Sequence, residues 1–103
     1  MSMTASLEKM LASGRDDSML RFGLGSAYFN EGEYELAVPH LESCISQDEN
    51  YSAAYKLLGK ALLKLERKEQ AREIFAQALP VARAQGDKQT EKEVTVFLKK
   101  LNK

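Results

Sequence analysis

Leu24-Gly25-Ser26-Ala27 recurs 34 residues later in the chain as Leu58-Gly59-Lys60-Ala61, with leucine, glycine and alanine in the same places. The same shift aligns Glu35-Leu36-Ala37 with Glu69-Gln70-Ala71, and it pairs apolar with apolar residues at several further positions. Self-similarity at a fixed period of about 20 to 50 residues is typical of proteins built by stacking one structural unit. This stretch therefore predicts a repeat protein.

Two full copies of the unit fit the chain, one over residues 18–51 and one over residues 52–85. In each copy, apolar residues recur three or four positions apart in two runs, which is the spacing of one face of an α-helix. Asn30-Glu31-Gly32-Glu33 separates the two runs of the first copy and is typical of a turn. Asp16 or Asp17 can cap the start of the first helix of this copy. Each copy is thus expected to be a pair of helices.

Two glycines lie inside predicted helices, where glycine costs about 1 kcal/mol relative to alanine. We expect Gly25 to face Ala37 and Gly59 to face Ala71, so that small residues let the two helix backbones approach closely. Packing between the helices must then offset the cost of the glycines.

Shorter segments at both ends continue the pattern. Residues 5–13, closed by Gly14, match the second helix of a repeat that lacks its first helix. After the second repeat, Gly86-Asp87 is expected to stop one helix and cap the next, a capping helix over residues 87–102. The sequence predicts an all-α fold of about five helices in a single domain, residues 1–103.

Pro80 falls late in the last repeat helix, which we expect to run on towards Gln85. Because proline lacks an N–H group and its ring crowds the preceding turn, we predict a kink or break near residues 76–79.

These motifs resemble the tetratricopeptide repeat, whose pattern is W-x2-L-G-x2-Y followed by A-x3-F at period 34. The first copy reads Arg21-x2-Leu24-Gly25-x2-Tyr28 with Ala37-x3-Leu41, and the second reads Tyr55-x2-Leu58-Gly59-x2-Leu62 with Ala71-x3-Phe75. Neither copy has the tryptophan, and Glu49 and Arg83 replace the family's closing proline. The resemblance implies a small, bacterial-type protein with two full repeats and flanking helices, folded as a right-handed α-solenoid of antiparallel helix pairs.

The resemblance also implies a function and a site. Tetratricopeptide proteins bind other proteins, and the first helix of each repeat lines a concave groove. The groove positions of this chain are Met19, Phe22, Ser26, Phe29 and Asn30 in the first repeat and Ala53, Lys56, Lys60, Leu63 and Lys64 in the second. Some family members bind the C-terminal carboxylate of chaperones through Lys and Asn in the groove. Lys56 and Lys60 partly match that set, whereas Phe22 and Ser26 do not.

The three groove lysines, Lys56, Lys60 and Lys64, are spaced four residues apart, so their charges gather on one helix face. Such a face attracts a carboxylate or an acidic segment; the alternative is a solvated surface. Phe22 and Phe29 either pack against neighbouring helices or form an apolar floor for a peptide side chain.

Composition excludes several other classes. The only histidine, His40, and the only cysteine, Cys44, lie four residues apart. We expect His40 at the surface and Cys44 buried, and we assign neither a catalytic nor a metal-binding role, because further ligands with suitable spacing are missing. No cofactor is implied. The sequence therefore gives no reason to favour an enzyme.

Charge and hydropathy argue against nucleic-acid binding and membrane contact. A formal net charge of zero argues against a general nucleic-acid-binding protein. The absence of an apolar run of about 20 residues or of a signal-peptide pattern predicts a cytoplasmic protein without membrane contact. Residues 1–50 carry nine acidic and three basic side chains, and residues 51–103 carry six acidic and twelve basic ones. This asymmetry keeps open a second hypothesis, a self-associating structural subunit such as a homodimer.

Overall fold

Helices account for nearly all of the computed structural model, which describes residues 3–102. The described chain forms six α-helices: α1 (Met3–Ala12), α2 (Ser18–Asn30), α3 (Tyr34–Gln47), α4 (Ser52–Lys64), α5 (Lys68–Gln85) and α6 (Lys88–Leu101). The expected number of about five was one too low, because each flanking half-repeat adds a helix to the four helices of the full repeats.

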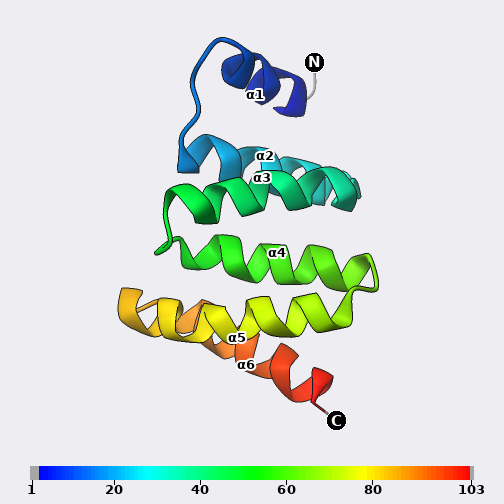
Figure 1. Cartoon of the computed structure of the whole chain (residues 1–103), viewed down its shortest axis with the longest axis vertical. Coiled ribbons are helices and arrows are strands. Elements are labelled where there is room, and N and C mark those ends of the chain that lie inside the picture. Colours follow the sequence, from blue (N-terminus) through cyan, green and yellow to red (C-terminus); the bar gives the residue numbers. More distant parts are fainter. Residues whose placement is uncertain (1–2, 103) are drawn as a thin grey trace.

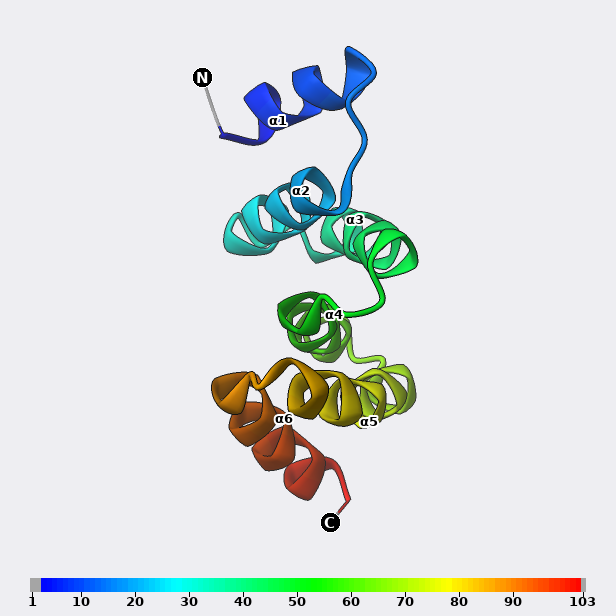
Figure 2. The ribbon, with the colours of Figure 1, turned by 90° about the vertical axis from the view of Figure 1, so that its left-hand side faces the viewer.

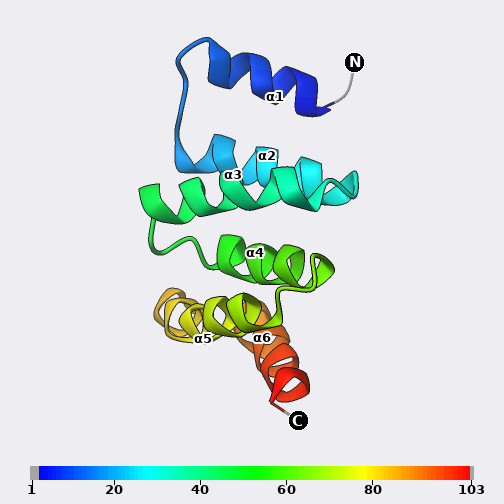
Figure 3. The ribbon, with the colours of Figure 1, turned by 45° about the vertical axis from the view of Figure 1, so that its right-hand side comes forward.

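The helices are stacked one after another along an axis of 43 Å, and the two ends of the chain lie at opposite ends of the stack (Figures 1 and 3). Figure 2 shows α2, α4 and α6 along one side and α3 and α5 along the other. The fold is the expected right-handed α-solenoid. Its two sides are built from different helices, so each side presents its own set of residues.

The core follows the repeat. Leu24, Leu41, Leu58 and Phe75 are almost completely buried, as are the small residues Ala37 and Ala71. The predicted close approach occurs at both glycines, but the partners differ from those expected. A Cβ atom on Gly25 would lie 2.5 Å from the Leu41 side chain, and one on Gly59 would overlap the Phe75 ring. A large side chain on the second helix thus fills the space above each glycine, because the alanine lies one turn away.

Aspartate side chains cap the starts of α2 and α6. Asp17, not Asp16, caps α2 by accepting a hydrogen bond from the Leu20 N–H, and Asp87 caps α6 in the same way through Thr90. Gly86 ends α5 in the left-handed region with φ of 70°. Helix α1 begins two residues earlier and ends one residue earlier than the predicted range of 5–13.

The expected break before Pro80 does not occur, since α5 is continuous to Gln85. Proline removes only one backbone hydrogen bond, and its ring is on the exposed side of the helix. Phe75, Ala78 and Ala82 are fully buried on the inner side, before and after the proline. Packing on both sides of Pro80 therefore keeps the helix in one piece.

Helix α6 is the first helix of a third, incomplete repeat. Ser18 and Ser52, which begin α2 and α4, are 34 positions apart, whereas Ser52 and Lys88, which begins α6, are 36 apart. With that shift, Val94 takes the buried position of Leu58, and Thr95 takes the position of Gly59. The third repeat thus carries a branched residue where the full repeats have glycine.

Candidate functional site

The predicted groove residues lie on α2 and α4, which run side by side on one side of the stack (Figure 2). Seven of them are partly buried: Phe22, Ser26, Phe29, Ala53, Lys56, Lys60 and Leu63. Three others, Met19, Asn30 and Lys64, are exposed, and Met19 keeps 68% of its surface accessible. The partly buried residues form the floor of the candidate site, and the exposed ones lie nearer the helix ends.

Both phenylalanines pack on other aromatic rings. Phe22 is stacked on Tyr51 with ring centroids 4.9 Å apart, and Phe29 meets the edge of Tyr34 at 5.2 Å. Such pairs contribute about 0.5–1.5 kcal/mol beyond simple burial. The interpretation that these rings pack against neighbouring elements is confirmed. Each ring also keeps part of its surface accessible, and its role as an apolar floor for a peptide stays a prediction. Tyr51 was missed in the sequence because it lies in the turn before α4.

The three lysines of α4 have different surroundings. Lys56 donates to Glu93 of α6, with Nζ and Oε2 2.8 Å apart. The ammonium of Lys60 lies over the Phe29 ring, 5.4 Å from its centroid, a cation–π geometry. Lys64 is exposed in the last turn of α4, where a cation interacts favourably with the helix dipole. Within residues 3–102, only Lys56 among these three forms an ion pair with a carboxylate.

Helix α6, which the sequence predicted only as a capping helix, adds a third row of residues. In the 36-residue register, Lys92, Val96, Lys99 and Lys100 correspond to Lys56, Lys60, Leu63 and Lys64. All four are exposed, Val96 at 48%. The change of period concealed them: α5 is four residues longer than α3, and the turn after it is two residues shorter. Testing a 36-residue shift would have found them.

His40 and Cys44 are not part of this surface. Cys44 is fully buried, and burial raises the pKa of its thiol to about 11, so the thiolate nucleophile is suppressed. His40 was expected at the surface, and this prediction was wrong. Its side chain is only 13% exposed and lies between α1, α2 and α3. Its ring is stacked on Tyr28, and Arg21 donates to Nδ1 over 3.0 Å. Burial, together with the Arg21 charge, lowers the pKa of His40.

The described residues, 3–102, contain no group of three His, Cys, Asp or Glu side chains placed to hold a metal ion. Across the same range, no helix has both the length and the apolar character needed to cross a lipid bilayer.

The paired helices, the glycine contacts and the row of first helices define a short helical-repeat solenoid. A sequence model described as "Tetratricopeptide repeat" matches residues 28–87, and the chain belongs to this family. The chain is 50% identical over 101 residues to the TPR repeat-containing protein PA0015 of Pseudomonas aeruginosa, covering 98% of this chain and 96% of that protein.

Solved structures show the same fold. The solution structure of protein BPP2914 from Bordetella parapertussis is 39% identical, with a TM-score of 0.85 over 99% of this chain and 89% of that one. The second TPR domain of human RPAP3, solved in complex with the HSP70 peptide SGPTIEEVD, is 22% identical. Its TM-score is 0.82 over 97% of this chain and 78% of that chain. At that identity the likeness is one of fold.

Proposed function

We propose that the surface formed by α2, α4 and α6 binds an acidic segment of a partner protein. The observation that carries the proposal is the position of Lys60, whose ammonium lies on the Phe29 ring and forms no ion pair in the described part of the chain. A carboxylate can approach this ammonium while an apolar side chain beside it contacts the phenylalanine. The site thus offers charge and apolar surface together.

The surrounding charges support an acidic ligand. Lys56 and Lys64 flank Lys60 along α4, and Lys92, Lys99 and Lys100 occupy the corresponding row of α6. The Glu93 carboxylate also reaches this surface, where it is bound to Lys56. Several like charges gathered in one region raise the local concentration of oppositely charged partners and speed their association at low salt.

The RPAP3 domain offers a comparison of ligand chemistry. Its bound peptide ends in Glu-Glu-Val-Asp, which combines three acidic side chains with one apolar side chain. Our proposal takes from this only the class of ligand, because this chain has Phe22 and Ser26 where the chaperone-binding members of the family have lysine and asparagine.

A direct binding measurement tests the proposal. The probe is a fluorescein-labelled peptide of alternating glutamate and leucine, with its glutamine counterpart as the neutral control. We expect fluorescence anisotropy to show binding of the acidic probe that weakens with added salt. The triple variant K56E/K60E/K64E should lose this binding while its circular dichroism stays helical. The matched control is K9E/K68E/R83E, which changes the net charge equally at exposed basic residues on α1 and α5, outside the groove.

Equal affinity of the triple variant and the wild type would refute the groove assignment. Tight binding of the glutamine peptide would refute the acidic ligand while leaving the groove intact, so the two parts of the proposal are tested separately.

We further propose that the protein acts by binding rather than by catalysis, in the cytoplasm. Self-association remains a separate hypothesis that rests on the acidic first half and basic second half of the chain. Light scattering across a salt series distinguishes the two: a dimer that dissociates in salt supports self-association, and a monomer at high protein concentration contradicts it.

A further inference from the structure

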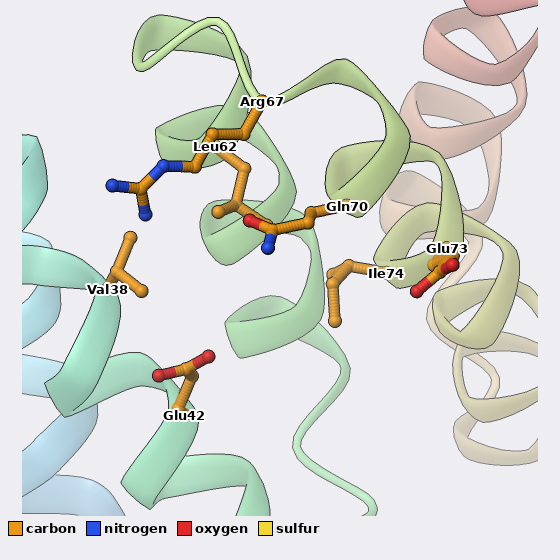
Figure 4. Close-up of a pocket in the computed structure, with 7 residues that line it drawn as sticks. All are labelled: Val38, Glu42, Leu62, Arg67, Gln70, Glu73 and Ile74. Atoms are coloured by element: carbon orange, nitrogen blue, oxygen red, sulfur yellow. The ribbon is translucent and has the colours of Figure 1, made fainter.

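A cavity of about 310 Å³ lies between α3 and α5 (Figure 4). In Figure 2 these two helices lie on the side of the stack opposite α2, α4 and α6. Its apolar lining comes from three helices, with Val38 on α3, Leu62 on α4 and Ile74 on α5. Two carboxylates, Glu42 and Glu73, lie at its rim. The cavity therefore combines an apolar floor with negative charge.

The repeat supplies an internal comparison for this cavity. Shifting back by 34 residues replaces Glu42 by Glu8, Leu62 by Tyr28 and Ile74 by His40. The 34-residue shift relates equivalent positions at this interface, since Thr4 and its counterpart Val38 are both 7% exposed. The region between α1 and α3 is thus the same site, one repeat earlier.

In the earlier repeat, the corresponding space is filled by two flat rings. Tyr28 donates its hydroxyl hydrogen to Glu8 over 2.9 Å. The His40 ring is stacked on Tyr28, with centroids 5.6 Å apart and planes at 8°, and His40 Nε2 lies 3.9 Å from Glu8 Oε1. The carboxylate at this position is therefore met by donor groups on flat side chains.

In the later repeat, the side chains of Leu62 and Ile74 have no N–H or O–H group that could donate a hydrogen bond. Among residues 3–102, neither Glu42 nor Glu73 takes part in an ion pair, whereas Arg67 at the rim is bound to Glu35 over 2.9 Å. The site keeps its carboxylate, aliphatic side chains replace the two stacked rings, and Arg67 and Gln70 also line the cavity.

We propose that the cavity between α3 and α5 binds an arginine side chain of a partner polypeptide. A guanidinium is flat, positively charged and rich in N–H donors, so it replaces both the ring stack and the donor that Glu42 lacks. The aliphatic part of the arginine packs on Ile74, which is only partly buried. This site is separate from the groove. It selects a positively charged side chain, whereas the groove is proposed to bind an acidic segment.

The test uses nuclear magnetic resonance with N-acetyl-arginine N-methylamide as the probe. The citrulline analogue has nearly the same shape and no charge, and it serves as the matched ligand. We expect the arginine probe to shift the amide signals of Val38, Glu42 and Gln70 in a saturable way. The citrulline probe should bind at least about tenfold more weakly, because a neutral urea group replaces the charged guanidinium as the hydrogen-bond donor to the carboxylate.

Two variants complete the test. E42Q/E73Q should abolish the shifts, whereas E33Q/E49Q, which removes the same charge outside the cavity, should retain them. L62Y/I74H rebuilds the filling of the first repeat and should exclude the probe while the protein stays helical by circular dichroism. Equal shifts with citrulline, or unchanged shifts in E42Q/E73Q, overturn the proposal. It is also overturned if the same signals move with protein concentration alone, since the occupant is then a second copy of the chain.

Discussion

Gly59 lies so close to Phe75 that the ring occupies the space a Cβ atom on Gly59 would need. Phe75 is completely buried, so its ring has no free volume into which it can turn. We predict that Gly59→Ala lowers the free energy of unfolding by about 1–3 kcal/mol, although alanine favours helix. Urea denaturation measures the change.

Gly23 provides the matched control. It lies on the neighbouring repeat, and a Cβ atom there would be 3.6 Å from Leu7, an ordinary contact. Gly23→Ala should therefore be neutral or raise stability by up to about 1 kcal/mol. Equal losses for the two variants would contradict the close approach at Gly59.

Glu66 has a positive φ of 61°, a conformation that costs a residue with a side chain about 1–2 kcal/mol. Its counterpart in the first repeat is Gly32, with φ of 79°. We predict that Glu66→Gly stabilises the protein by about 0.5–1 kcal/mol, the flexibility of glycine in the unfolded chain offsetting part of the gain. Thermal and urea unfolding test this. Gly32→Ala should be destabilising by a similar amount, and the opposite signs distinguish backbone strain from a general effect of the turns.

His40 is predicted to make the stability depend on pH. Its pKa in the folded protein lies below the ordinary value of 6.5, since burial and Arg21 disfavour the charged ring more than Glu8 and Asp16 favour it. The unfolded chain therefore binds the proton at higher pH than the folded one, and stability falls as the pH drops through 6.5. The midpoint of thermal unfolding should decrease between pH 7.5 and 5.5.

The control for this effect is His40→Gln, which keeps an acceptor for Arg21 but does not titrate. Its unfolding midpoint should be nearly constant over the same pH range. A decrease as large as that of the wild type would assign the pH dependence to other groups.

Glu93 is predicted to oppose ligand binding, because its carboxylate already occupies Lys56. Glu93→Gln should increase the affinity for the acidic glutamate–leucine peptide by a few-fold, about 0.5–1 kcal/mol, as expected for a partly exposed charge. Glu91→Gln on the same helix makes the same charge change, and it should have a smaller effect because Glu91 pairs with Arg83 instead. Anisotropy titrations measure the peptide affinity of both variants, and an equal gain for the two would contradict the role of the Glu93–Lys56 pair.

Much of the fold could be predicted from the sequence because the repeat is a local pattern that recurs. Leu24-Gly25 and Leu58-Gly59 placed the helix pairs correctly, and Gly86-Asp87 marked the last turn. The error at Pro80 has a different origin. The tendency of proline to interrupt a helix is local, whereas the packing of Phe75 and Ala82 that keeps α5 continuous depends on other helices.

The candidate site was predicted less completely for the same reason. Lys56, Lys60 and Phe29 lie on helices in the regular register, and their positions followed from it. The residues of α6 did not, because the longer α5 changes the period. The cavity next to Glu42 could not be predicted either, since it depends on which side chains fill the space between helices two steps apart.

Thr95 distinguishes α6 from the first helices of the two full repeats. In both full repeats, a second helix packs directly over a glycine, but the equivalent position on α6 carries a branched side chain. At the other end, Met3 and Met10 of α1 correspond to the small residues Ala37 and Cys44, whose positions face a first helix. A further copy packed in the spacing of the repeats would therefore meet Thr95 at one end and Met3 and Met10 at the other. We expect these side chains to disfavour the stacking of successive copies into a continuous filament.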